Sequence, residues 1–112
     1  MNRASVLGDL VTFAKPIDRL AETIGVLGWS DTPVVMLTAG QIVSVLQRAR
    51  AGALTAADVE AWADLTECRE DIDYQPEHHE EILQAIYMLA KPVLNGSLDE
   101  ALTDQLIASL LP

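Results

Sequence analysis

Three side chains that could hold a metal ion lie close together in the sequence: Glu77, His78 and Glu81. Carboxylate and imidazole groups are ligands of manganese, iron and zinc, and a helix would place these residues on one face. Di-iron bundles use Glu-x-x-His on two helices with two further glutamates, whereas this chain has one copy in reverse order. We therefore expect no metal and no cofactor. A carboxylate/His metal-binding protein, with enzymatic use of the metal, is the alternative.

The remaining residues give little support to covalent or acid–base catalysis. Cys68 lies between Glu67 and Arg69, with Glu70 next, and nearby carboxylates disfavour a thiolate. The sequence contains no glycine-rich phosphate loop, HExxH motif or Gly-x-Ser-x-Gly elbow. Paired carboxylates act as acid and base in a cleft that separates their pKa values, and the acidic pattern here predicts an exposed face. We expect that the protein is not an enzyme.

Negative charge is concentrated in residues 58–81. This stretch holds ten of the seventeen acidic residues and one basic residue, Arg69, so its formal charge of −9 is nearly the whole net charge of −10. Local charge of one sign attracts oppositely charged partners and speeds their association. On a helical wheel, several of these carboxylates fall within about 60° of one another. We expect a docking surface for a basic protein, formed by Glu60, Asp64, Glu67, Glu70, Asp71 and Asp73.

The acidic stretch has two other interpretations. It can be an ordinary solvated helix face that keeps the protein soluble. Alternatively, the apolar N-terminal half, including Trp29 and Val34–Leu37, drives self-association into a homo-oligomer, and the acidity only maintains solubility. Trp29 lies in a loop flanked by glycine and proline, where it fits either a core position or an interface anchor.

The composition predicts a single helical domain over residues 1–112. Half of the residues are hydrophobic and few are aromatic, which favours a packed core of aliphatic side chains. The chain has one cysteine, and no apolar run reaches the roughly 7–15 residues of a signal-peptide core or the ~20 of a membrane span. We therefore expect a cytoplasmic protein. The net charge of −10 argues against nucleic acid or a membrane surface as a partner.

Helical periodicity recurs along the chain and predicts an all-α fold, a single compact bundle of roughly five or six short helices. Residues 71–76 are expected to form a turn. Val34–Leu37 resembles a short strand, but no second strand-like run is evident, so we expect buried extended chain or part of a helical turn. The helix that begins after Thr55 is expected to continue to about Glu70. The predicted core contains Trp62, Leu65, Ile82, Ile86, Leu102 and Leu106.

Polar residues at helix starts predict where three helices begin. Thr38 with Gln41, and Ser97 with Glu100, have the spacing of capping boxes, and Thr55 is a further expected N-cap. The apolar face expected for the helix after Pro76 contains Ile82, Leu83, Ile86, Tyr87 and Ala90. Arg69, the single cation in the acidic stretch, is expected to form a local ion pair with Asp73, Glu70 or Asp71.

A motif in residues 51–74 resembles one found in small, functionally uncharacterised, all-helical bacterial proteins. The pattern is Trp-Ala-x(3)-Glu-x-Arg-x-Asp-Ile-x-aromatic, and here it consists of Trp62-Ala63, Glu67, Arg69, Asp71-Ile72 and Tyr74. The resemblance covers about half of the chain if the later segment from Leu89 to Leu98 is included. Some small acidic helical bacterial proteins of this kind act as immunity proteins against basic toxins. The resemblance thus implies a helical fold and an immunity-like or regulatory role.

Overall fold

The computed structural model describes residues 2–28, 30, 32–67, 69–92 and 98–110, and most of them are helical. The order of elements confirms a mainly helical chain but not a strictly all-α fold, because two short strands pair with each other. The elements are α1 (Arg3–Val11), α2 (Ile17–Leu27), β1 (Val35–Leu37), α3 (Ala39–Arg50), α4 (Ala56–Thr66), β2 (Ile72–Tyr74), the 3-10 turn η1 (Pro76–His78), α5 (His79–Ala90) and α7 (Glu100–Leu110).

The helix starts follow from capping residues. Thr38 and Thr55 each accept a hydrogen bond from the backbone N–H three residues later, and the side-chain oxygens of Gln41 and Asp58 accept from the backbone N–H of Thr38 and Thr55. These reciprocal bonds satisfy amide groups that a helix leaves unpaired at its N-terminus. Ser97 lies outside the described residues. Asp99 Oδ1 accepts from the Leu102 amide at 2.8 Å, and the last helix begins at Glu100.

The expectation that Val34–Leu37 has no strand partner is wrong. β1 runs parallel to β2, with Val35 opposite Ile72 and Leu37 opposite Tyr74. Beyond the strands, the Gln75 amide donates to Leu37 O at 3.0 Å, and the Gln75 side chain accepts from the Ala39 amide at 3.1 Å. The segment expected to be a turn after residue 70 therefore contains a strand that supplies the missing partner.

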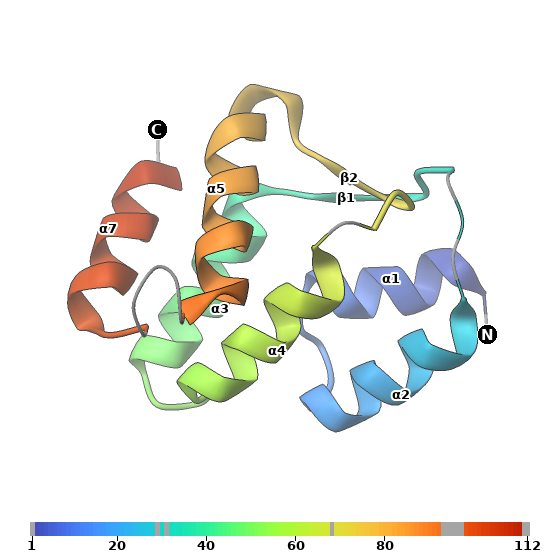
Figure 1. Cartoon of the computed structure of the whole chain (residues 1–112), viewed down its shortest axis with the longest axis horizontal. Coiled ribbons are helices and arrows are strands. Elements are labelled where there is room, and N and C mark those ends of the chain that lie inside the picture. The colour runs from blue at the N-terminus through green and yellow to red at the C-terminus, as the bar shows by residue number, and fades with distance from the viewer. Residues whose placement is uncertain (1, 29, 31, 68, 93–97, 111–112) are drawn as a thin grey trace.

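Helices α1, α2, α3 and α5 all contact α4, and α7 packs on α3 and α5. Figure 1 shows α1 and α2 together on one side, α3, α5 and α7 on the other, and the two strands crossing between these groups. The expected core is confirmed for Trp62, Ile82, Ile86 and Leu106, which are buried, whereas Leu65 and Leu102 are partly buried against it. Among the described residues, no helix is long and apolar enough to cross a bilayer.

Trp62 is the largest fully buried side chain in the described core. Its indole Nε1–H donates to the carbonyl oxygen of Leu10 at 2.6 Å, and its ring stacks on Phe13 with centroids 6.1 Å apart. The single polar atom of the side chain is therefore paired, as burial requires. These contacts join α4 to α1 and hold the start of the acidic stretch in place.

Candidate functional site

A surface groove lies between β2 and α5. It has a volume of about 820 Å³, and its lining combines an apolar floor with an acidic rim. The floor comes from both elements: Ile72 and Tyr74 lie two residues apart in the strand, and Leu83, Ile86 and Tyr87 lie at spacings of three and four in the helix. Carboxylates line the rim on both sides. The floor residues are Ile72, Tyr74, Leu83, Ile86 and Tyr87, and the rim carboxylates are Glu67, Glu70, Asp73 and Glu80.

Part of the apolar floor is open to solvent. Leu83 is 47% exposed and Tyr87 is 43% exposed, and these two residues are one helical turn apart on α5. Both belong to the apolar face expected for this helix, although neither was among the residues expected in the core. Ile82 and Ile86 are buried against the core, and Ile86 also lies at the bottom of the groove. An exposed apolar patch bordered by polar residues is typical of an interaction site.

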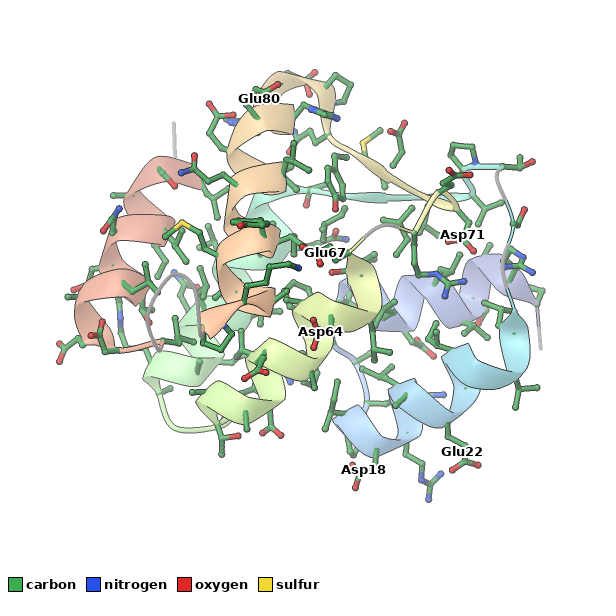
Figure 2. The ribbon with its side chains drawn as sticks, in the orientation of Figure 1. Asp18, Glu22, Asp64, Glu67, Asp71 and Glu80 are labelled. Carbon is green, nitrogen blue, oxygen red and sulfur yellow. The ribbon has the colours of Figure 1, made fainter. Side chains whose placement is uncertain are left out.

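The predicted docking residues do not all reach the groove. Glu70 and Asp73 are exposed and line it, and the half-buried Glu67 lies at its edge where α4 ends. Figure 2 shows Glu67 at the end of α4 and Glu80 at the start of α5. Asp64 is exposed on α4 and Glu60 borders a separate, smaller hollow. The structure thus divides the predicted acidic surface into a groove part and a part outside it.

Asp71 does not lie on the expected acidic surface, because its side chain is fully buried. Arg69 Nε and Nη2 donate to its two carboxylate oxygens at 2.9 Å, and Arg3 Nη1 donates to Oδ2 at 2.8 Å. The ion pair expected for Arg69 is therefore confirmed with Asp71. α4 ends at Thr66 rather than near Glu70. Glu70 and Asp71 lie in a turn before β2, so Asp71 is not on the exposed helix face where it was expected.

The two arginines also bind the end of α2. Arg69 Nη2 donates to Gly28 O at 2.8 Å, and Arg3 Nη2 donates to Leu27 O at 3.1 Å. The last carbonyl groups of a helix have no partner within that helix, and guanidinium groups satisfy them well. Asp71 and its two arginines therefore join α1, α2 and the segment that leads into β2. This network fixes one wall of the groove.

The ion pairs lower the pKa of Asp71. Burial acts to raise it, but the Arg69 hydrogen bonds, the Arg69 charge and the Arg3 hydrogen bond outweigh burial, and the pKa lies below its usual value. Charged hydrogen-bond donors favour the ionised carboxylate because they stabilise it more than the neutral acid. The network is therefore sensitive to acid.

Acid is expected to destabilise the wild type more steeply than the variant Asp71→Asn. The folded pKa is lowered, so the contribution of Asp71 is fully present above the unfolded value of about 3.9 and is lost as the pH falls through the folded value. The difference in unfolding free energy between the two proteins should therefore stay constant from about pH 7 to about pH 5 and shrink between about pH 5 and about pH 2. Denaturant titrations across this range measure it, and a constant difference would contradict the role of the carboxylate.

A basic side chain of the protein itself occupies one end of the acidic rim. The Lys91 ammonium pairs with Glu67 Oε1, and its Nζ lies 5.3 Å from the centroid of the Tyr87 ring. Carboxylate and aromatic face together stabilise a cation more than either does alone. The chemistry at this end of the groove therefore suits a lysine or arginine.

Sequence reasoning missed the contribution of α5 to this site. Glu80, Leu83 and Tyr87 line the groove, yet none was among the expected docking residues. One signal was present in the sequence, because the apolar face expected for α5 is wider than one packing partner can cover. Of the segment expected to drive self-association, Val34 and Met36 are exposed, whereas Leu37 is buried.

The metal alternative has no support in the geometry. Within the described part of the chain, no three or more His, Cys, Asp and Glu side chains are arranged to hold an ion, and this includes Glu77, His78 and Glu81. His79 instead packs against Tyr74, with ring centroids 5.7 Å apart. The expectations about Trp29 and Cys68 concern positions outside the described residues. Comparison with protein-family models, with curated proteins and with solved structures found no match.

Proposed function

We propose that this is a non-catalytic cytoplasmic protein that binds a basic partner protein through the groove between β2 and α5. One observation carries the proposal: four carboxylates border an exposed apolar floor in a single groove. Of the expected docking residues, we propose that Glu67, Glu70 and Asp73 contact the partner. Glu80 from α5 is added to them. An immunity-like or regulatory protein directed against a basic partner would use such a surface.

The two parts of the groove contribute differently to binding. The carboxylates accelerate encounter with a positively charged partner and orient it, and this effect weakens as salt screens the charges. The apolar floor stabilises the bound complex because water leaves Leu83 and Tyr87 on contact. A solvated acidic face needs no apolar centre, so the exposed apolar residues favour a docking site over a surface that only maintains solubility.

Neutralising the rim is expected to weaken partner binding by at least about tenfold, because each lost charge pair slows association or speeds release. The test variant is Glu70→Gln/Asp73→Asn/Glu80→Gln, which keeps side-chain size and leaves the Asp71 network intact. Wild type and variant would be used to capture proteins from source-cell lysate, and the captured protein would be purified and its affinity measured at low and high salt. We expect a basic protein whose binding weakens with salt.

The control removes three charges elsewhere. Asp18→Asn/Glu22→Gln/Glu100→Gln changes the net charge equally, and Figure 2 shows Asp18 and Glu22 on α2, away from Glu80. The control is expected to bind like the wild type. Equal loss in both triple variants, or affinity unchanged between low and high salt, would show that the groove carboxylates do not form the docking surface.

A further inference from the structure

We propose that the groove binds an amphipathic, basic α-helix of the partner, about two turns of which lie along α5. This inference rests on the proposed function and specifies the form of the ligand. Its apolar stripe would cover Leu83 and Tyr87, and lysine or arginine residues beside the stripe would meet the carboxylates of the rim. Helices of this kind bind in apolar grooves through side chains spaced three and four residues apart.

The dimensions of the apolar floor suit a helix. From Glu80 to Tyr87 the groove follows α5 over eight residues, and the seven steps between them correspond to about 10.5 Å at 1.5 Å per residue, or two helical turns. Leu83 and Tyr87 are four residues apart, so they form a ridge of the kind that packs between side chains of a neighbouring helix. A helix of the partner would therefore complete the packing that α5 lacks on this side.

The hydrogen bonding of β2 argues against an extended peptide. A peptide that adds to a sheet needs the backbone groups along one edge of a strand, and β2 uses one of its edges to pair with β1. The Tyr74 amide donates to Asp73 Oδ1 at 3.0 Å, and this bond occupies a donor that an added strand would need. A helix needs no such groups because its own backbone bonds are internal.

The charges around the floor specify a basic helix. Carboxylates lie on both sides of the floor, with Glu80 on α5 and Glu70 and Asp73 on the opposite side. Of the basic groups that line the groove, Arg69 is paired with the buried Asp71 and His79 packs on Tyr74. Lys91, which pairs with Glu67 beside the Tyr87 ring, is an internal example of the contact that a partner's lysine or arginine would make.

The test uses a labelled peptide of about 14 residues, since shorter isolated helices are marginal in water. Its leucines share one helical face and lysines flank them. One control peptide has the same composition scrambled so that the leucines are dispersed, and a second has glutamate in place of every lysine. Fluorescence anisotropy would measure binding of each peptide to wild type, to Leu83→Gln/Tyr87→Gln, to Glu70→Gln/Asp73→Asn/Glu80→Gln and to Asp18→Asn/Glu22→Gln/Glu100→Gln.

We expect the amphipathic basic peptide to bind wild type about tenfold more tightly than either control peptide, and each groove variant to lose about tenfold in affinity. The variant with charges removed on α2 and α7 should bind as wild type does. All substituted residues are exposed, and circular dichroism would verify that each variant is folded.

If the scrambled peptide binds wild type as tightly as the amphipathic peptide does, recognition depends on charge alone and the proposal of a helical ligand is overturned. Unchanged binding by Leu83→Gln/Tyr87→Gln would do the same. If the captured basic partner depends on Glu70, Asp73 and Glu80 but not on Leu83 and Tyr87, the proposed function stands and the helical ligand does not. If the captured partner depends on none of these residues, both proposals are overturned.

Discussion

Replacing Asp71 with alanine is expected to lower the free energy of unfolding by about 3–5 kcal/mol, because removing one partner of a buried ion pair leaves the other charge buried and uncompensated. The Arg69 side chain is only 3% exposed, so it cannot turn to water without disrupting the wall of the groove. Arg3 would lose its carboxylate as well. Urea unfolding followed by circular dichroism measures the change.

Asp73 provides the matched control for this prediction. It lies two residues from Asp71 in the same acidic stretch, but its side chain is exposed. Asp73→Asn keeps the oxygen that accepts from the Tyr74 amide, and we expect its stability to stay within about 0.5 kcal/mol of the wild type. A similar loss in Asp71→Ala and Asp73→Asn would show that the buried network does not set the stability of the fold.

The second large effect is expected from Trp62→Ala, which should cost about 3–5 kcal/mol because it leaves a cavity in a packed core. Trp62 is fully buried and contacts Phe13. Trp62→Phe should fall between the alanine variant and the wild type. It keeps an aromatic ring but removes the donor to Leu10 O, which still accepts from the Phe13 amide. Thermal and urea unfolding by circular dichroism would rank the variants.

Asp64→Ala serves as the control on the same helix, since Asp64 is exposed where Trp62 is buried. We expect it to change the unfolding free energy by less than about 0.5 kcal/mol. Equal stability of Trp62→Ala and Asp64→Ala would contradict the central position of Trp62 in the core.

Local features of the fold were predictable from the sequence. The threonine caps at Thr38 and Thr55 depend on residues three positions apart, so short-range spacing identifies them. The core position of Trp62 follows from its place on the apolar side of a helix. The sheet was not predictable, because each strand has three residues and their partners lie far apart in the sequence. Such short segments have no periodicity of their own.

The site was predicted only in part, because some of its features are local in the sequence and others depend on distant residues. Charge concentration indicates an acidic surface, and Glu70 and Asp73 do line the groove. The concentration of charge cannot show that Asp71 is buried, because the burial of this carboxylate depends in part on its ion pair with Arg3, 68 residues away. Nor does charge indicate Leu83 and Tyr87, whose exposure depends on which side of α5 the core covers. Non-local packing therefore decides which of the predicted residues remain available to a partner.

The link between Arg3 and Asp71 also affects the order in which the fold can form during synthesis. α1 is synthesised long before Trp62 and Asp71, so the bonds between Leu10 and Trp62 and between Arg3 and Asp71 form only after both later residues have been made. Contacts between distant segments require closure of long loops, which slows folding relative to a helical bundle with local contacts. The N-terminal helices therefore emerge with their contacts to each other available but without those to α4 and Asp71, which form only after translation has passed Asp71.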